Sequence, residues 1–275
     1  MKKGIKKTGV VLALIFFLVN AVFPIYWMFV TSLKSRQEIY SEVPTLWPKD
    51  PSFQNYIEAF SDAQFGTYMR NSFIVTIVTS VLVVLIAIMG GYAMARMKFK
   101  GKNAVMAFLL GSQMISALTI LVPLFNMFST LNLIDNLASL MICYTVFNVP
   151  FCLITMSSFF KRIPVALEEA ACIDGCSRFT AVRKIILPIM TPGIIATFVF
   201  AFTGAWNEMF LSIMLINRNG VRTIPAGLMN FVQKFDINWG QMSAASIASL
   251  VPIACMFLIV QRYVVDGLTA GAVKE

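Results

Sequence analysis

The chain has 275 residues, of which 58% are hydrophobic and 13% charged, and its mean hydropathy is +0.78. Soluble domains are about 45–50% apolar and about 25% charged, so this composition excludes an ordinary soluble globular protein and indicates several membrane-crossing segments. The 22 Lys and Arg outnumber the 13 Asp and Glu, but their distribution along the chain fits membrane topology rather than binding of nucleic acid.

Six apolar stretches are each long enough for an α-helix to cross a bilayer. Helices are expected because backbone polar groups in lipid must bond within their own segment. The first stretch resembles a signal peptide, but its apolar run continues through Val30, so we expect a retained helix rather than a cleaved leader. The sequence therefore predicts an all-α membrane protein with one domain, 1–275, and six transmembrane helices near 9–31, 71–95, 104–128, 137–159, 190–216 and 242–261.

The basic residues predict the orientation of these helices. If the N-terminus lies inside, 15 Lys and Arg fall in the inner segments and 7 in the outer ones. The positive-inside rule then places both termini and the 160–189 loop in the cytoplasm. Of the longer outer segments, 32–70 is expected to be an irregular loop, whereas Pro225 in 217–241 is expected to start a short amphipathic helix.

The inner loop contains the string EEAACIDGCSRFTAVRKIILP, which has the features of two short helices joined by a turn. Pro164 suits the first turn of a helix, and the carboxylates of Glu168 and Glu169 suit its N-terminal dipole. Gly175 favours a left-handed helix end. A second helix is expected from about Ser177, with an apolar stripe, and Leu187-Pro188 is expected to end it. The stripe comprises Phe179, Val182, Ile185 and Ile186.

These features are compatible with an amphipathic loop resting on lipid headgroups or with a docking surface for a partner protein. The fixed residues and their spacing match the EAA-x3-G-x9-I-x-LP loop at every position. The chain therefore resembles the membrane subunits of binding-protein-dependent ABC importers, in which this loop docks into the ATPase. The resemblance implies that docking involves Glu169, Ala170, Ala171, Asp174, Gly175, Ile185, Leu187 and Pro188.

Further strings extend this resemblance over nearly the whole chain: YMRNSFIVT, GGYAMARMKFKGK, AWNEMF and QRYVVDGLTAGAVKE. They are similar to the carbohydrate branch, and more narrowly to the maltose-transporter G-type permease subunit of type I architecture. The resemblance implies sugar or oligosaccharide import by alternating access in the plasma (inner) membrane of a bacterium or archaeon. It also implies three kinds of partner: two cytoplasmic ATPase subunits, a second homologous permease and an extracellular solute-binding protein.

The chain itself is not expected to be an enzyme. A nucleotide-binding loop of the form G-x-x-x-x-G-K-[ST] is absent, the nearest approach being Gly101-Lys102-Asn103, so ATP would be bound by the partner subunit and no cofactor is expected here. The sequence has no histidine and no CxxC pair, which argues against a metal site or an intramembrane enzyme.

Polar residues within the predicted spans are candidates for the translocation path, chiefly Asn148, Asn207 and Glu208. An intramembrane carboxylate is energetically costly, so Glu208 is a functional candidate, although we expect it to serve helix packing or gating rather than direct sugar contact. A secondary transporter would be expected to carry paired intramembrane charges. The remaining alternative is the same type of permease for a polyol or glycerol phosphate. Weaker path candidates are Gln113, Ser116, Thr119 and Asn126.

Overall fold

The structure is a computed structural model that describes the backbone of residues 2–61, 64–232 and 237–272, with side chains from residue 10 to residue 261 within these ranges. Over these residues the regular secondary structure is helical, and one isolated antiparallel bridge joins Val232 to Ile237. The predicted all-α class is confirmed. Lys234 and Lys274, which entered the charge count, lie outside the described residues.

The chain forms two compact units, Met1–Gly66 with Gly227–Val251, and Thr67–Ala226 with Pro252–Glu275. The first unit contains α1 (Lys2–Ser32), α2 (Arg36–Ile39), α3 (Gln54–Ser61), the short 3-10 helix η4 (Met229–Phe231) and the beginning of α14 (Trp239–Ala272). The short helix α13 (Ile224–Leu228) continues from the second unit into the first. Its position confirms the helix predicted to start around Pro225.

Helix α3 corrects the expectation that 32–70 is irregular. The Ser52 hydroxyl accepts the N–H of Gln54 at 3.1 Å, and the side chains of Gln54 and Glu58 are hydrogen-bonded at 2.9 Å, so local capping and an i, i+4 pair stabilise the helix. The Gln241 amide donates to Glu58 at 2.7 Å. Hydrogen bonds from Gln241 and then Gln54 lower the pKa of Glu58, so α3 is attached to the start of α14 by an ionised carboxylate.

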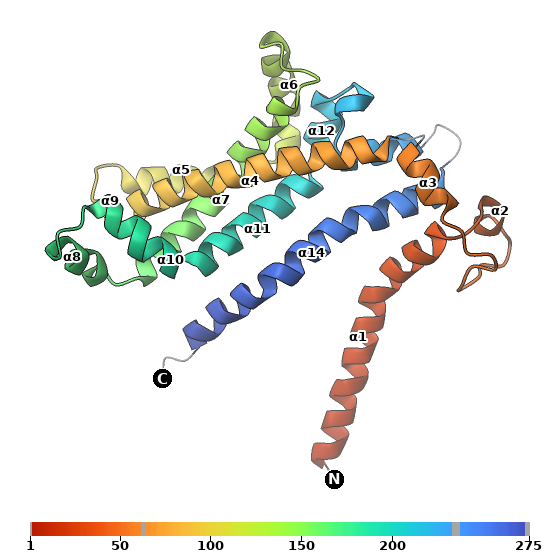
Figure 1. The fold of residues 1–275 in the computed structure, drawn as a ribbon, viewed down its shortest axis with the longest axis horizontal. Coiled ribbons are helices and arrows are strands. Elements are labelled where there is room, and N and C mark those ends of the chain that lie inside the picture. The colour runs from red at the N-terminus through yellow and green to blue at the C-terminus, as the bar shows by residue number, and fades with distance from the viewer. Residues whose placement is uncertain (1, 62–63, 233–236, 273–275) are drawn as a thin grey trace. The chain divides into compact units, whose positions relative to one another are not determined.

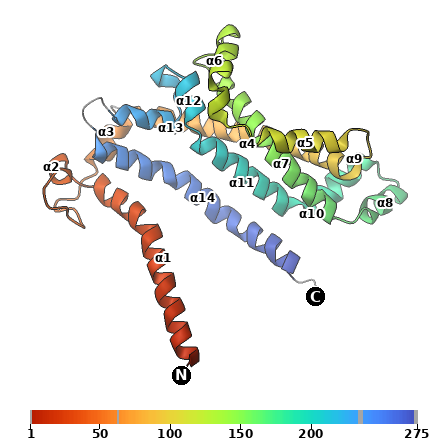
Figure 2. The same cartoon turned by 180° about the vertical axis from the view of Figure 1, so that it is seen from behind.

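In the second unit α4, α7 and α11 run side by side, and α8 and α9 lie at one end of them (Figures 1 and 2). The elements in chain order are α4 (Phe65–Arg96), α5 (Lys102–Ser112), η1 (Ala117–Ile120), α6 (Leu121–Thr130), α7 (Leu137–Arg162), α8 (Ala166–Ile173), α9 (Arg178–Ala181), the π-helical turn η2 (Val182–Ile186), α10 (Leu187–Ile189), α11 (Thr191–Asn207), α12 (Phe210–Leu215) and η3 (Asn219–Val221).

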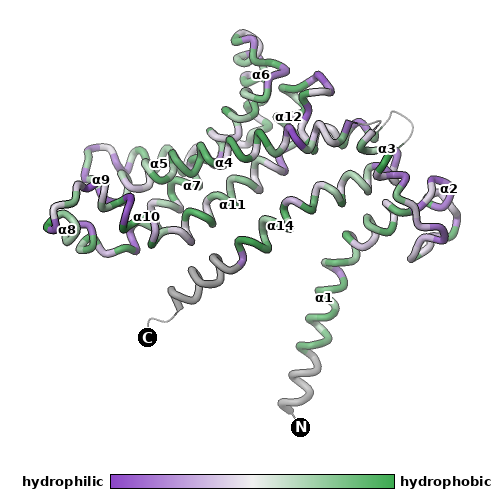
Figure 3. The backbone as a smooth tube through the Cα atoms, viewed as in Figure 1, coloured by the Kyte–Doolittle hydropathy of each residue, from purple (hydrophilic) through white to green (hydrophobic). Residues whose placement is uncertain are grey.

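Four described helical stretches are long and apolar enough to cross a membrane: Val10–Ser32, Phe65–Arg96, Leu137–Arg162 and Trp239–Gln261. Two bent helix pairs, Lys102–Ser112 with Ala117–Thr130 and Arg178–Ile189 with Thr191–Asn207, also pass the test of apolarity. The count is therefore four, or up to six if each bent pair is one span. Hydrophobic residues dominate α4 and α7, and hydrophilic residues gather around α2 and α9 (Figure 3).

Two predicted spans are not continuous helices. The 104–128 stretch bends by 90° between α5 and η1, where the Ser112 hydroxyl bonds back to the Leu109 carbonyl at 2.8 Å and the chain leaves the α-helix. The 190–216 stretch is interrupted at Glu208, whose backbone is extended with φ −72° and ψ 122°. The apolar composition of both stretches predicted membrane spans, but composition does not indicate where local side-chain hydrogen bonds interrupt a helix.

Helices α4 and α7 approach each other closely at Gly91. A Cβ atom at this position would lie 3.0 Å from the backbone nitrogen of Ser157 and 3.0 Å from the Cβ of Met156. Small residues allow such close backbone approach between membrane helices, which associate through packing rather than through a hydrophobic force in lipid. The glycine therefore sets the distance between the two helices.

Replacing Gly91 by valine is expected to force α4 and α7 apart and to destabilise the chain by about 1–3 kcal/mol, as overpacking does elsewhere. The matched control is Gly111→Val, because a Cβ at Gly111 meets nothing within 4 Å. Thermal unfolding of the purified complex should show a lower Tm for Gly91→Val alone. Equal Tm values for the two variants would contradict the close-packing interpretation.

Candidate functional site

The segment Pro164–Gly175 folds as predicted, with one small shift at its start. Helix α8 begins at Ala166 rather than at Pro164, and the Pro164 carbonyl accepts the N–H of Leu167 at 3.3 Å. Glu168 and Glu169 lie in the first turn, where negatively charged carboxylates interact favourably with the positive end of the helix dipole. The sequence therefore located the helix to within two residues.

Gly175 ends α8 in the predicted left-handed conformation, with φ +88°. Its N–H bonds to the Cys172 carbonyl at 3.1 Å, and the N–H of Cys176 bonds to the Ala171 carbonyl at 2.9 Å. These two bonds form a Schellman motif, which satisfies carbonyls at the end of the helix and needs a residue with positive φ. A Cβ at Gly175 would meet nothing within 4 Å, so the constraint is the backbone conformation and not lack of space.

The second helix begins where the sequence predicts and ends at Ile189, one residue after the predicted stop at Leu187-Pro188. Ser177 caps α9 by accepting the N–H of Thr180 at 3.2 Å. The helix then passes through the π-helical turn η2 and α10 as far as Ile189, and the chain bends by 76° before α11. Pro188 is the second residue of α10. The N–H of Leu187, the residue before it, bonds to the Val182 carbonyl five residues back, as in a π-helical turn.

The π-helical turn also divides the predicted apolar stripe. Phe179 is 76% exposed, whereas Ile186 is fully buried. A turn closed by i→i+5 bonds holds more residues than an α-helical turn, so residues after it face a direction that 3.6-residue spacing does not predict.

The structure separates the eight predicted docking residues into two sets. Ala171 is buried, and Ile185 and Leu187 are half-buried, the latter two packed against a core cluster that includes Met156, Phe160 and Ile186. The other five residues are exposed: Glu169, Ala170, Asp174, Gly175 and Pro188. Ile173 and Phe179 are 86% and 76% exposed, so the exposed set has large apolar neighbours.

A buried ion pair attaches α8 to the end of α4. Arg96 Nε lies 2.7 Å from Glu168 Oε1, and the two side chains are only 10% and 11% exposed. Arg96 Nη2 donates to the Ile163 carbonyl at 2.8 Å, and the Tyr92 hydroxyl donates to Glu168 Oε2 at 3.1 Å. Sequence reasoning missed this link, because 72 residues separate the partners and no spacing rule connects them.

A cavity of about 820 Å³ lies in the second unit among α5, η1, α7, α11 and α12. Two of the predicted path residues, Asn148 and Glu208, line it together with Gln113. Asn207 is exposed and is not among the lining residues; its amide donates to the Thr203 carbonyl at 3.0 Å. Much of the wall is apolar, with Phe147, Phe151 and Phe200.

Glu208 has a structural task at this cavity. Both carboxylate oxygens lie 3.1 Å from the backbone nitrogen of Leu211, which donates to them in the first turn of α12. Such a side-chain acceptor satisfies an N–H that has no partner within the helix. Glu208 is therefore both the residue at which the 190–216 helix is interrupted and the residue that caps α12.

Replacing Glu208 by glutamine is expected to leave transport within about threefold of normal, because the amide oxygen still accepts the Leu211 N–H. Glu208→Leu removes the acceptor and should destabilise α12 by about 0.5–2 kcal/mol. Uptake by vesicles containing the full complex, measured beside its Tm, distinguishes the two variants. Loss of uptake in the glutamine variant at an unchanged Tm would show that the negative charge acts in the path.

The segment after α12 is held to other parts of the second unit. Asp135 Oδ1 accepts the N–H groups of Asn217 and Arg218 at 2.5 and 2.8 Å. The Asn71 amide donates to the carbonyls of Gly220 and Arg222 at 3.1 and 3.0 Å. These bonds fix the backbone of 217–222.

Comparison with known proteins gives a family match. Residues 87–269 match the family described as binding-protein-dependent transport system inner membrane component. The chain is 37% identical over 257 residues to the sulfoquinovosyl glycerol transport system permease protein SmoH of Agrobacterium fabrum, covering 94% of this chain and 90% of the relative. It is 34% identical over 256 residues to the trehalose transport system permease protein SugB of Mycobacterium tuberculosis, covering 92% and 93%.

The fold is also found in a solved structure. A chain of a bacterial ABC transporter involved in the import of the acidic polysaccharide alginate superimposes with a TM-score of 0.81 at 22% sequence identity, covering 94% of this chain and 96% of that one. The family match includes α8, α9 and the cavity-lining helices α7 and α11. The chain thus belongs to the permease family of binding-protein-dependent ABC importers.

Proposed function

We propose that the chain is the membrane-spanning permease subunit of an ATP-driven importer that moves a sugar or oligosaccharide by alternating access. Its cargo would be delivered by an extracellular solute-binding protein. The relatives named above are transport permeases, and ATP is hydrolysed by a separate ATPase subunit. The cargoes in their names, sulfoquinovosyl glycerol and trehalose, contain sugar rings and favour a sugar over a polyol or glycerol phosphate.

The observation that carries this function is the geometry of 160–189. Its exposed residues Glu169, Ala170 and Asp174 lie on or next to a short helix whose end is fixed by Gly175. Small side chains allow a partner to approach closely, and an exposed carboxylate offers it a hydrogen-bond acceptor. We infer that this surface docks an ATPase subunit, whereas Ile185, Leu187 and Ala171 hold it against the helix bundle.

The assembly would contain two ATPase subunits, a second homologous permease and the binding protein. The large apolar residues of α1 from Val10 to Val19 are 52–69% exposed. Such a surface requires lipid or another membrane chain to cover it. The segment 217–241 is our candidate for contact with the binding protein, since its first residues are held in place by Asp135 and Asn71.

The proposed topology has six spans within one membrane domain, 1–275, with both termini and the 160–189 loop in the cytoplasm. Each bent pair then crosses the plasma membrane of a bacterium or archaeon once. The excess of Lys and Arg in the proposed inner segments supports this orientation.

The cavity in the second unit is our candidate for this chain's share of the translocation path. Asn148 and Gln113 offer amide donors and acceptors to a sugar, and the phenylalanines offer apolar faces. Glu208 shapes the cavity by capping α12. Asn207 stays a path candidate only if a second permease chain brings its exposed amide to the pathway.

The decisive experiment purifies the assembled complex and measures ATP hydrolysis with its binding protein in the presence of sugars, polyols and glycerol 3-phosphate. Stimulation by a sugar together with ATP-dependent uptake of that sugar into vesicles is the expected result. Stimulation only by sorbitol or glycerol 3-phosphate would replace the sugar assignment, and a complex that lacks an ATPase would overturn the importer assignment.

A further inference from the structure

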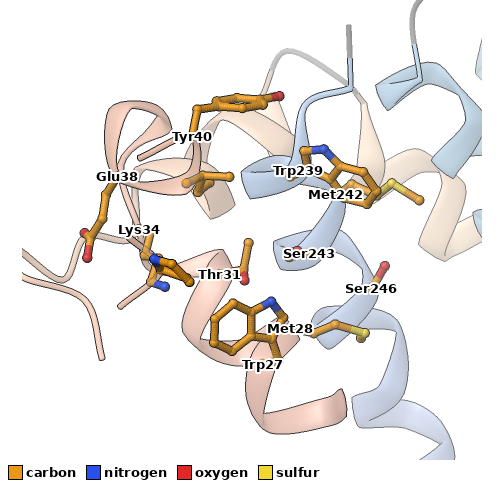
Figure 4. A pocket seen from close by; sticks show the side chains of 12 residues that line it. Trp27, Met28, Thr31, Lys34, Glu38, Tyr40, Trp239, Met242, Ser243 and Ser246 are labelled. Atoms are coloured by element: carbon orange, nitrogen blue, oxygen red, sulfur yellow. The ribbon is translucent and has the colours of Figure 1, made fainter. Parts of the chain in front are cut away.

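A second cavity, of about 460 Å³, lies within the first unit between the last turns of α1, the segment that follows it and the first two turns of α14 (Figure 4). Its volume falls within the range of about 300–1,000 Å³ found for small-molecule sites. It shares no residue with the cavity lined by Asn148 and Glu208.

Three aromatic side chains from three segments line this cavity: Trp27 of α1, Tyr40 after α2 and Trp239 of α14. Tyr40 and Trp239 are 54% and 46% exposed, so their rings are accessible to a ligand. The Tyr40 hydroxyl donates to the Ile237 carbonyl at 2.6 Å, which restrains that ring. Accessible aromatic rings provide flat apolar faces against which the C–H face of a sugar ring packs.

Hydroxyl groups stand between these rings. Thr31, Ser243 and Ser246 line the cavity, and their side chains form no hydrogen bond to another described residue. Ser243 is only 7% exposed and Thr31 9%. Hydroxyl groups in the wall of a mainly apolar cavity offer both donors and acceptors, so they suit a polar ligand that carries hydroxyls of its own.

The two charged groups of the lining are fixed. The Lys34 ammonium lies 4.7 Å from the centre of the Trp27 ring and donates to the Thr45 carbonyl at 2.5 Å, which leaves further donors on the nitrogen. Glu38 accepts the Thr45 hydroxyl at 2.5 Å, and this hydrogen bond lowers the pKa of its carboxyl. One cation and one anion leave the lining with no net charge, which disfavours an anionic lipid headgroup and suits a neutral ligand.

We propose that this cavity binds a neutral sugar ring of the cargo, as a subsite separate from the one in the second unit. Trp239 and Tyr40 would contact the apolar face of the sugar, while Ser243, Thr31 and Lys34 would bond to its hydroxyls. This inference rests on the proposed function, because it requires a sugar cargo. In the proposed topology the cavity lies at the outer end of the spans, where cargo leaves the binding protein.

The test uses the full complex in nanodiscs without binding protein. Trehalose, maltose and N,N′-diacetylchitobiose are first assayed for binding-protein-dependent uptake, and the sugar that is imported becomes the probe. Its binding is then measured by saturation-transfer NMR for Trp239→Leu and Ser243→Ala. Matched controls are Trp47→Leu and Ser249→Ala, which change the same residue types outside the lining.

The expected result is weak saturable binding of the sugar by the wild-type complex. Trp239→Leu should lower the affinity for the sugar about three- to tenfold, as loss of one aromatic contact predicts. The two control variants and the Tm values should be unchanged. Equal binding in Trp239→Leu and Trp47→Leu, with sugar uptake intact in the wild type, would overturn this subsite alone. Absence of uptake for every sugar, with uptake of a polyol or glycerol 3-phosphate, would overturn the sugar assignment and this inference with it.

Discussion

Replacing Gly175 by valine is expected to reduce coupled transport about fivefold to thirtyfold while the chain still inserts and the complex can still be purified. The φ of +88° at Gly175 is costly for any residue with a Cβ and more so for a β-branched one. A cost of about 1–2 kcal/mol per residue corresponds to about a fivefold to thirtyfold loss of the native loop conformation. The measurement is uptake per ATP hydrolysed in vesicles that contain all subunits.

Two controls separate backbone strain in the loop from strain in general. Gly101 has nearly the same φ, +89°, and a Cβ placed there would also meet nothing within 4 Å, so Gly101→Val places a β-branched residue at positive φ outside the 160–189 loop. Gly175→Asn introduces a side chain that tolerates positive φ and should retain most of the transport. Normal uptake with Gly175→Val, or equal loss with Gly101→Val, would contradict the assignment of this turn to ATPase docking.

The sequence predicted the α8–α9 unit well because the signals there are local. Gly175, Ser177 and the two glutamates act within one or two turns, so their spacing alone specifies where the helices begin and end. The course of the second helix was predicted less well. The stop predicted at Leu187-Pro188 lies within one residue of the observed end at Ile189, but a π-helical turn has no composition signal, so the directions in which Phe179 and Ile186 face were not predicted.

Long-range contacts account for most of what the sequence did not reveal. The link between Arg96 and Glu168 joins the ends of separate helices, and the attachment of α3 through Glu58 and Gln241 depends on how distant segments fold. Polar residues in apolar spans did mark the cavity, since Asn148 and Glu208 both line it. The roles of these two residues could not be predicted from the sequence, because only the three-dimensional structure shows that Glu208 caps α12.

The largest loss of coupling outside the EAA string is expected from breaking the Arg96–Glu168 pair. Arg96→Met leaves the Glu168 carboxylate with only the Tyr92 hydroxyl in a site that is about nine-tenths closed to solvent. Removing one partner of a buried ion pair costs about 3–5 kcal/mol, because the remaining charge stays desolvated. Helix α8 should then detach from the end of α4, so ATP hydrolysis would continue with less sugar moved per ATP.

A double variant distinguishes this positioning role from a general need for charge. Arg96→Met with Glu168→Leu removes both charges, so it should be more stable than either single variant, and the coupling energy between the two sites should be about 0.5–3 kcal/mol. It should nevertheless stay poorly coupled, because no bond then holds α8 to Tyr92 and α4. Lys100→Met, an exposed basic residue nearby, serves as the control. If the double variant transported as efficiently as the wild type, the ion pair would contribute to stability only. The docking loop would then be coupled to the helix bundle through the packing of Ile185, Ile186 and Leu187.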